Sequence, residues 1–308
     1  MTAATVALCL SSCKKDEPTP SPNPSPDKHL AQILYIDDEE GTSGPYETWN
    51  WEGDQLNDIT YHWLKYGDSS VAETFSYQDN RIIYSEEFSS ISAHTTYFYD
   101  GNRLVRMKAE LTSPKYQGSY INYTFEYEGD KIRTMIQNIH RVSADSKHPL
   151  GQENTLSSTG QQSMSVHQPE NANLSKSDPK ATSEVTRTYE FTWDVDNLVK
   201  VVETCSQPDK SVSYTSITEM TYDNKPNPYF GIYGFRCIFL TRYYAHFSAN
   251  NMLTYHSVTT NPSSKDVREY SVTRTYTYSD DNYPVEFVEE YVSPNSTSIE
   301  KYAYRYVE

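Results

Sequence analysis

The sequence lacks the features that several common classes of protein require. No run approaches the roughly 20 consecutive apolar residues of a membrane-spanning helix, and the mean hydropathy is −0.76. Its 26 Lys and Arg are outnumbered by 42 Asp and Glu, so the net charge of −16 disfavours binding to a nucleic-acid backbone. Glycine is scarce, with 11 in 308 residues, and no phosphate loop, zinc-protease helix or nucleophile elbow is present.

The N-terminus predicts an export signal followed by a lipid anchor. The short apolar run Thr2–Leu10 is typical of a signal peptide, which we assign to residues 1–12. Leu10-Ser11-Ser12-Cys13 resembles the lipobox of bacterial lipoproteins, which implies cleavage before Cys13 and lipidation of its thiol. Lys14-Lys15-Asp16-Glu17 resembles the surface-export signal of Bacteroidetes lipoproteins. We therefore expect attachment to a membrane through Cys13, without a spanning segment.

Residues 13–29 are predicted to be a lipidated tether. Proline occupies every second position from Pro18 to Pro26, which favours an extended polyproline II conformation and excludes the segment from a sheet. Cysteine is scarce in the rest of the chain, where only Cys205 and Cys237 remain. They could form a disulfide in an oxidising envelope or remain as two buried thiols, because their distance cannot be read from the sequence.

Residues 30–308 repeat one short pattern that predicts antiparallel hairpins. Each unit has an alternating strand that ends in an aromatic residue, which we call the anchor. The anchors are Trp51, Tyr77, Tyr99, Tyr127, Trp193, Tyr222, Phe247 and Tyr278. Two residues earlier stands an apolar residue, usually aromatic, on the same strand face. Three residues later stands Asp or Asn in seven of the eight units, and five residues later an apolar residue in all but one, so a tight turn follows each anchor.

Turns of this kind alternate with connections rich in Ser, Pro and Asn. This alternation predicts an all-β fold, a large antiparallel up-and-down meander of about 16–18 strands that forms a curled sheet or a barrel-like structure. The gap at residues 143–183 has no aromatic residue, and we expect a disordered insertion there. The unit at Tyr222–Pro228 contains two prolines, which predict a bent or wider turn.

The repeat explains most of the aromatic residues without a binding site. Cross-strand packing in the core is the simpler role for the aromatic column, although exposed rings near Trp49–Trp63 or on the final strand could stack on sugars. The other strand face is polar at Thr275 and Glu126, whereas a membrane barrel needs an apolar outer band. Adjacent acids such as Glu86 and Glu87 point to opposite faces and cannot by themselves form a catalytic pair.

The stretch Tyr97–Leu104 resembles the YD-type repeats of wall-associated and toxin-shell proteins. Together with the lipobox and tether, it makes the chain similar to a Bacteroidetes outer-membrane lipoprotein family of unknown function with a porin-like fold. This resemblance implies a cell-envelope address and no activity. We expect a non-enzymatic binding or structural module, lipid-anchored at the cell outer membrane and exposed at the surface, with no cofactor or metal. The alternatives are a glycan-binding or glycan-processing accessory protein and a porin-like membrane barrel; the candidate partners are a glycan or another envelope protein.

Overall fold

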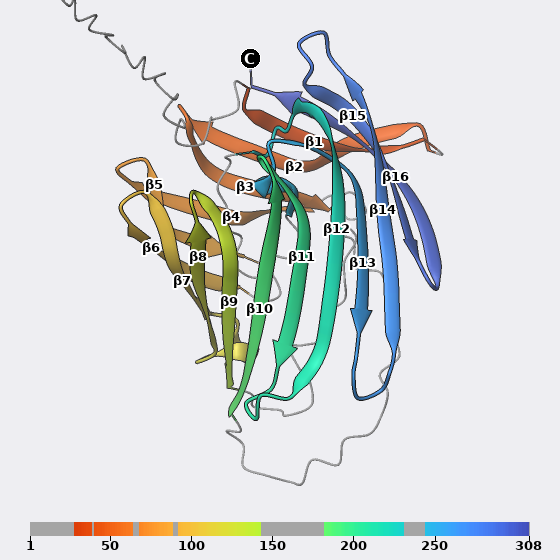
Figure 1. Ribbon diagram of the computed structural model, residues 1–308. Coiled ribbons are helices and arrows are strands. Elements are labelled where there is room, and N and C mark those ends of the chain that lie inside the picture. The colour runs from red at the N-terminus through yellow and green to blue at the C-terminus, as the bar shows by residue number, and fades with distance from the viewer. Residues whose placement is uncertain are drawn as a thin grey trace, which may run out of the picture.

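The computed structural model shows one closed barrel in which every strand pairs antiparallel with its neighbours in the sequence (Figure 1). The structure describes residues 28–38, 40–63, 68–88, 92–142, 182–230 and 244–307. The first eight strands are β1 (Leu30–Asp37), β2 (Thr42–Glu52), β3 (Gln55–Trp63), β4 (Asp68–Gln78), β5 (Arg81–Glu87), β6 (Ala93–Asp100), β7 (Arg103–Leu111) and β8 (Tyr120–Glu128). The others are β9 (Lys131–Val142), β10 (Thr182–Asp194), β11 (Asn197–Ser206), β12 (Val212–Pro226), β13 (Asn250–Thr260), β14 (Val267–Tyr278), β15 (Pro284–Ser293) and β16 (Ser296–Tyr306).

Pairing of β1 with β16 closes the barrel. Tyr35 lies opposite Tyr302, and the amide of Val307 donates to the carbonyl of His29 over 2.8 Å. Closure leaves the sheet without an exposed edge on which another chain could pair. The prediction of an all-β up-and-down meander of about 16–18 strands is confirmed, and of the two shapes that it left open the chain adopts the barrel.

Within the described ranges, two short 3-10 helices interrupt the meander, η1 (Pro114–Tyr116) and η4 (Tyr244–Phe247). The helices that the structure describes include none with the length and apolarity needed to cross a membrane.

The anchors mark where each rim hairpin turns. From Trp51 to Trp193, each anchor lies opposite the apolar residue five positions later, as Trp51 does with Leu56, and a β-bulge precedes each anchor. The residue two positions after the anchor has a positive φ, for example 57° at Gly101 and 52° at Asp79. The bulge and the left-handed turn residue together increase the local twist of the sheet, as a closed barrel requires.

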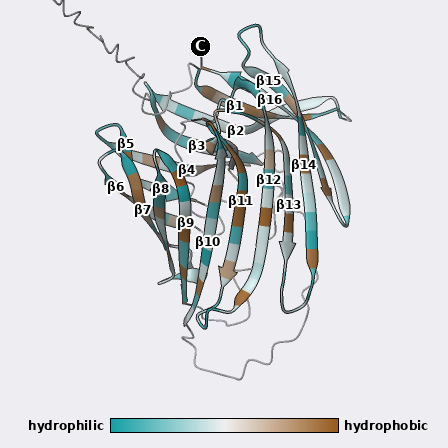
Figure 2. Ribbon diagram, viewed as in Figure 1, coloured by the Kyte–Doolittle hydropathy of each residue, from teal (hydrophilic) through white to brown (hydrophobic). Residues whose placement is uncertain are grey.

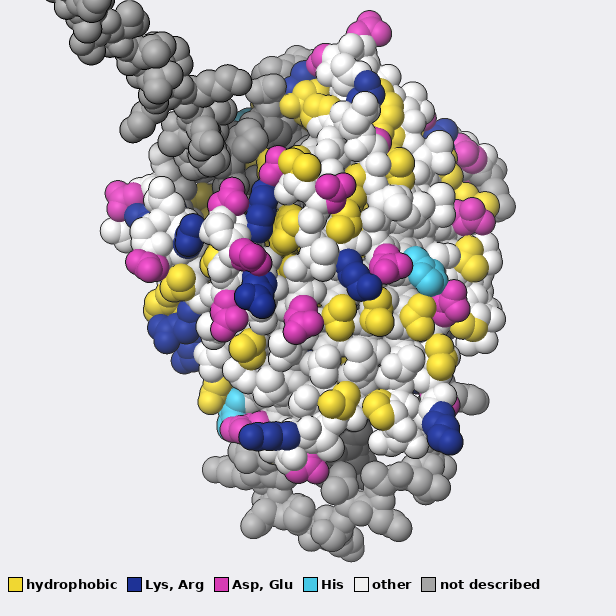
Figure 3. All heavy atoms as spheres, in the orientation of Figure 1, with side chains coloured by type: hydrophobic (Ala, Val, Ile, Leu, Met, Phe, Trp, Pro, Cys, Tyr) yellow, Lys and Arg dark blue, Asp and Glu magenta, His cyan; other side chains and the backbone are white. Residues whose placement is uncertain are grey.

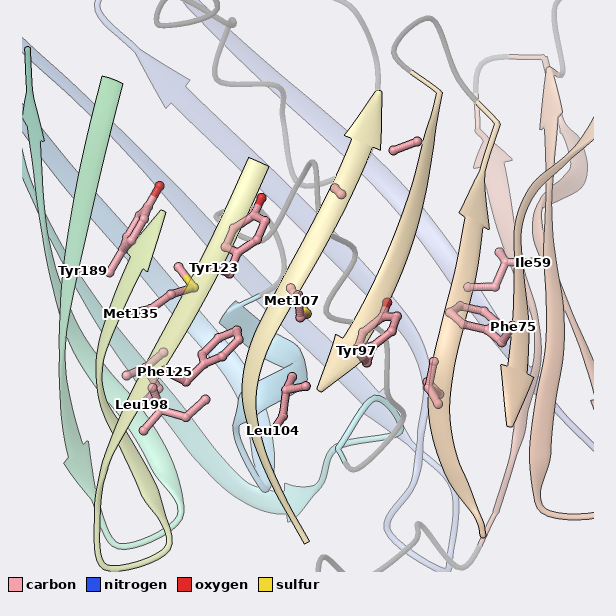
Figure 4. Packing of buried hydrophobic residues seen from close by; sticks show 14 of the residues in the cluster. Ile59, Phe75, Tyr97, Leu104, Met107, Tyr123, Phe125, Met135, Tyr189 and Leu198 are labelled. Atoms are coloured by element: carbon pink, nitrogen blue, oxygen red, sulfur yellow. The ribbon is translucent and has the colours of Figure 1, made fainter. Parts of the chain in front are cut away.

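The core lies inside the barrel and is built from the predicted aromatic face. For the anchors from Trp51 to Trp193, the residues two positions before and five positions after the anchor are buried, and the close-up in Figure 4 shows several of them packed against one another. Members of this core are Trp49, Phe75, Tyr97, Phe125, Phe191, Leu56, Ile82, Leu104, Ile132 and Leu198. The rings are therefore mainly cross-strand packing, as the simpler interpretation of the sequence held.

The sixth and seventh units depart from the predicted pattern. Tyr222 lies opposite Met252, so one hairpin takes its first strand from the Tyr222 unit and its second from the Phe247 unit. Phe247 lies in η4 rather than at the end of a strand, so its assignment as a hairpin anchor is wrong. The β16–β1 pair instead has its own anchor, Tyr306, which the sequence analysis missed.

Several predictions fall outside the described residues: the signal peptide at 1–12, lipidation of Cys13, the tether apart from residues 28 and 29, and most of the insertion at 143–183. The two last residues of that insertion already belong to β10, where Thr182 pairs with Val142. Cys205 is a buried free thiol, and Cys237 lies outside the described residues, so their pairing stays a prediction.

Candidate functional site

The anchors form a ring of hydrogen bonds at the rim of the barrel. Tyr127 donates its hydroxyl to the carbonyl of Leu104 over 2.8 Å, and Trp193 donates Nε1–H to the carbonyl of Ile132 over 2.7 Å. Each bond crosses from one hairpin to the preceding one, and the acceptor is the apolar residue that follows the preceding anchor. Equivalent donors are Trp51, Tyr77, Tyr99, Tyr222 and Tyr306. In the β14–β15 hairpin the donor to the preceding hairpin is Tyr276, whose hydroxyl lies 3.3 Å from the carbonyl of Met252, while the anchor Tyr278 donates to Asp223.

The Asp and Asn residues of the turns link neighbouring hairpins. Gln55 donates to Asn80 over 3.0 Å, and Asn197 donates to Asn250 over 2.9 Å. Lys131 reaches Asp196 over 2.5 Å. Asp and Asn tolerate left-handed backbone, but in the two-residue turns that follow an anchor only Asn80 adopts it, whereas the first residue of the turn adopts it in all five. The Asp and Asn column therefore serves mainly as a set of lateral acceptors.

A belt of mostly polar side chains encircles the barrel interior, with one residue from each strand. On the strand that ends in the anchor, this residue lies four positions before the anchor. On the partner strand, it is the residue that pairs with that position. We call it the polar girdle. Its pairs are Tyr35–Tyr302, Glu47–Tyr61, Glu73–Glu87, Thr95–Ala109, Tyr123–Gln137, Tyr189–Glu203, Thr218–Ser257 and Arg274–Glu289. Among these positions Ala109 alone has no hydrogen-bonding group. In Figure 4 the hydroxyl ends of Tyr123 and Tyr189 point away from Phe125 and Leu198, so the polar layer lies next to the aromatic core.

One sector of the girdle is a network of polar contacts centred on Glu203. Its carboxylate accepts from Tyr214 over 2.6 Å and from Tyr189 over 3.4 Å, and lies 3.7 Å from Nε of Arg187. Burial raises the pKa of Tyr189 and of Tyr214 well above that of a free phenol, and the negative charge of Glu203 adds to it. Both hydroxyls therefore remain protonated donors at neutral pH.

A second sector holds an ion pair between β14 and β15. Nε of Arg274 donates to Oε2 of Glu289 over 2.8 Å, and the side chain of Glu289 is 1% exposed. The other carboxylate oxygen of Glu289, Oε1, has no hydrogen-bond partner among the described residues. The guanidinium also lies 5.5 Å from the ring centroid of Phe287. Burial disfavours the charged guanidinium, but Glu289 and the nearby Tyr276 and Tyr304 outweigh it and keep the pKa of Arg274 raised.

Glu73 and Glu87 form a carboxylate pair that the sequence analysis missed. They lie directly opposite each other on β4 and β5 and are 2% and 8% exposed. Side chains in such positions have Cβ atoms about 5 Å apart. Sequence reasoning compared Glu87 only with its neighbour Glu86, although its place ten residues after Tyr77 was a signal that could have found the pair.

A row of four inward tyrosines lies beside the girdle, one on each of β12 to β15. We call Tyr214, Tyr255, Tyr270 and Tyr291 the tyrosine wall; all four are half-buried. The hydroxyls of Tyr255 and Tyr270 are 2.9 Å apart. The ring centroids of Tyr255 and Tyr270 are 5.6 Å apart, and those of Tyr270 and Tyr291 are 6.1 Å apart.

Hydroxyl side chains of β12 and β13 extend the polar surface beside the wall. Ser216 and Ser257 are 3.1 Å apart, Thr218 donates to Ser257 over 3.1 Å, and Thr259 donates to Ser216 over 3.0 Å. This part of the interior therefore combines aromatic faces with groups that both donate and accept hydrogen bonds.

The outer surface of the barrel is polar at mid-strand. Outward positions alternate with the buried ones and carry mostly Thr, Asn, His, Lys and Glu. Ion pairs cross between strands there, including Lys200 with Glu219 at 3.2 Å and His256 with Glu269 at 2.8 Å. Figure 3 shows acidic and basic side chains interspersed with hydrophobic ones over the visible face, and in Figure 2 teal, white and brown alternate along the strands.

The exposed aromatic candidates of the sequence analysis are mostly internal. Trp49 is 4% exposed, and Tyr302 and Tyr304 on the final strand are 1% and 6% exposed. We had named these two regions as candidates for contact with a partner, and their burial corrects that expectation for these three residues. The described residues contain no group of three or more His, Cys, Asp or Glu that could hold a metal ion.

Comparison with known proteins finds likeness in structure only. No family model matches the chain, and no curated protein matches it. The chain is similar in structure to a porin-like protein from Bacteroides vulgatus, at 12% identity, a TM-score of 0.49 and coverage of 91% of this chain and 99% of that one. A porin-like protein from Bacteroides uniformis aligns at 9% identity, a TM-score of 0.39 and coverage of 92% and 99%. The assignment of the fold rests on the strand pairing of this chain itself.

Proposed function

We propose that the chain is a non-enzymatic, lipid-anchored protein of the cell outer membrane whose barrel stands in water and serves as a binding or structural module. The observation that carries this proposal is the polar, ion-paired outer surface at mid-strand. A lysine or arginine on the lipid face of a membrane barrel costs about 2–4 kcal/mol at the bilayer centre. Lys108, Lys200 and Lys301 all occupy outward mid-strand positions, so hydrocarbon would be a poor environment for this surface.

The lipobox-like segment that ends at Cys13 would attach the protein to the membrane, which the polar outer surface of the barrel does not do. A lipid on Cys13, followed by a proline-rich tether, would hold the barrel beside the membrane rather than in it. Exposure at the cell surface is part of the proposal and is supported by the lysine and acidic residues that follow Cys13.

The test is a comparison of the full chain with its Cys13→Ala variant. Expected results are palmitate labelling of the natural chain alone and a Cys13→Ala variant that is monomeric and folded in buffer without detergent. A variant that folds only in micelles, or that permeabilises vesicles, would overturn the proposal. Protease treatment of intact cells then decides whether the barrel faces outward.

A porin-like membrane barrel is the second candidate, and the observation that favours it is the strand count. Closed barrels with an even number of antiparallel strands span bacterial outer membranes, and the 16 strands here match that architecture. The same detergent and vesicle measurements distinguish the two. A glycan-processing enzyme draws its support from the Glu73–Glu87 pair, but these side chains expose little surface to a glycosidic bond.

A further inference from the structure

We infer that the tyrosine wall and the adjoining girdle bind a neutral saccharide inside the barrel. This inference deepens the proposed binding function and depends on it, since it names a ligand class and a site. It rests on three observations: the aromatic row on β13 to β15, the surrounding groups that donate and accept hydrogen bonds, and the partial exposure of the wall tyrosines in the interior.

The aromatic row offers a stacking surface. Tyr255, Tyr270 and Tyr291 stand on consecutive strands with centroids 5.6 and 6.1 Å apart and rings tilted by 32° and 38°. They form a strip of three neighbouring rings across the sheet rather than a single isolated ring. Such a strip suits the flat C–H faces of successive sugar rings, which gain dispersion and apolar contact on aromatic surfaces.

The neighbouring polar groups suit hydroxyl recognition. The half-buried Thr259 donates to Ser216 over 3.0 Å, and the buried Ser216 and Ser257 continue this hydroxyl network over 3.1 Å. The Thr259 hydroxyl can also accept from a sugar hydroxyl, which likewise donates and accepts. Arg187 and Glu203 add a guanidinium and a carboxylate whose side chains are 15% and 14% exposed. A few polar groups beside an aromatic surface are the usual composition of a small-molecule site.

The interior can admit a ligand in this sector more readily than elsewhere. Side chains lining eight strands already fill a small barrel, whereas barrels of 16 strands enclose more space than their inward side chains occupy. The four wall tyrosines are half-buried, while the inward residues next to the girdle on the opposite arc, such as Ala93 and Leu111, are 0% and 4% exposed. Solvent therefore reaches the wall.

Among the ligand classes that stack on tyrosine, the negative charge of the barrel interior favours a neutral one. The net charge is −16, and the girdle holds five glutamates, Glu47, Glu73, Glu87, Glu203 and Glu289, against one arginine, Arg274. Nucleotides and sulfated or acidic sugars would bring further negative charge into this interior at an electrostatic cost. A neutral saccharide carries no such cost.

The test uses the full chain, purified in mild detergent, and a panel of short neutral glucan, mannan, galactan and xylan fragments. We expect at least one fragment to bind by calorimetry, with saturation-transfer NMR showing contact through the C–H faces of its rings. Replacing Tyr270 by Ala should weaken that binding about tenfold, since it removes the central ring of the strip. Tyr270→Phe keeps the ring and should bind within about threefold of the natural chain, as a lost neutral hydrogen bond is a small effect.

The matched control is Tyr120→Ala, which removes a tyrosine from the outer face of β8, where its ring stacks on His140. This variant should bind as the natural chain does. If Tyr270→Ala fails to fold, Tyr291→Ala tests the same strip from its edge. The inference is overturned if no neutral fragment binds, if only sulfated counterparts of these fragments, tested alongside them, bind, or if the wall variants bind as tightly as Tyr120→Ala. A folded, lipidated barrel that binds no sugar would leave the proposed address standing, so the two failures are distinguishable.

Discussion

The anchor position requires a ring that carries a hydrogen-bond donor. In six regular hairpins and in the β16–β1 pair the anchor is Tyr or Trp, and each donates to a carbonyl of the preceding strand pair. A phenylalanine ring would fill the same space but could not make this bond. The repeat therefore selects its anchors for a donor as well as for β propensity, and the misassigned Phe247 is the one predicted anchor without a donor.

Replacing Tyr127 by Phe tests this role. The variant keeps the ring over which Arg103 lies, at 5.6 Å from its centroid, and loses the bond to the carbonyl of Leu104. We expect the free energy of unfolding to fall by about 1 kcal/mol, the usual net value of a neutral hydrogen bond. Urea denaturation measures it, with Tyr120→Phe on the outer face as the control that should change little. Equal losses in both variants would show that the rim bond contributes nothing specific.

The raised pKa of a buried anchor tyrosine leads us to expect a loss of folding stability at alkaline pH. Burial raises the pKa of Tyr222 to about 12, while a phenol in the unfolded chain titrates near 10. Between these values the folded state holds a proton that the unfolded state has lost, so stability is fully present below about pH 10 and declines as pH rises towards 12. The slope is at most about 1.4 kcal/mol per pH unit for each such group. Denaturation from pH 8 to 12 should therefore be flatter at the alkaline end for Tyr222→Phe, and an unchanged slope would contradict the assignment.

At the scale of a strand pair, the rim turns differ in how well their residues suit a left-handed backbone. Four of the five two-residue turns that follow an anchor have Gly or Asp two positions after it, but the β10–β11 hairpin has Val195, with φ of 50° and 80% exposure. A β-branched side chain is unfavourable there, and glycine is not. The Val195→Gly variant should gain about 1 kcal/mol, after allowing for the greater freedom of glycine in the unfolded chain.

The converse substitution is Gly129→Val in the β8–β9 hairpin, where Gly129 occupies the same turn position with φ of 62°. This variant should lose a similar amount of stability. Thermal denaturation of the two variants side by side gives the comparison. Stabilisation by both, or by neither, would mean that backbone strain at this position is not what decides turn stability.

The Arg274–Glu289 pair joins β14 to β15 inside the barrel. Replacing Glu289 by Leu leaves a buried guanidinium without its carboxylate, and removal of one partner of such a pair typically costs about 3–5 kcal/mol. A second substitution, Arg274→Met, removes the stranded charge, so the double variant should recover most of that loss. A double-mutant cycle by denaturation measures the coupling, and a double variant as unstable as Glu289→Leu would contradict it.

The turns, the registers and the buried face could be predicted because each depends on neighbours within one hairpin. The anchor, the turn residue and the apolar residue that follows all lie within a few positions of one another, so their spacing alone indicates the hairpin. The girdle was also encoded at a constant spacing, as Glu47 and Glu73 show, but its members differ chemically and do not stand out as a column. Closure could not be predicted, because it depends on the summed twist and stagger of all strands.

Closure of the whole molecule through β1 and β16 leads to a last prediction. In an up-and-down barrel each strand contacts its two neighbours, so no hairpin is structurally first. The ends lie together, since Val307 bonds to His29. A short linker from Val307 to Lys28, with new ends between Val142 and Thr182, would turn the β1–β16 pair into a local hairpin. It would make β9–β10 the pair that closes the ring. Because every native pair is kept, this circular permutant should adopt the same barrel with a melting temperature within a few degrees of the natural chain, as circular dichroism can show.

A chain ending at Ser293 lacks β16 and leaves β1 and β15 as open edges, so it should aggregate. If the truncated chain folds as well as the permutant, closure is not what stabilises the barrel.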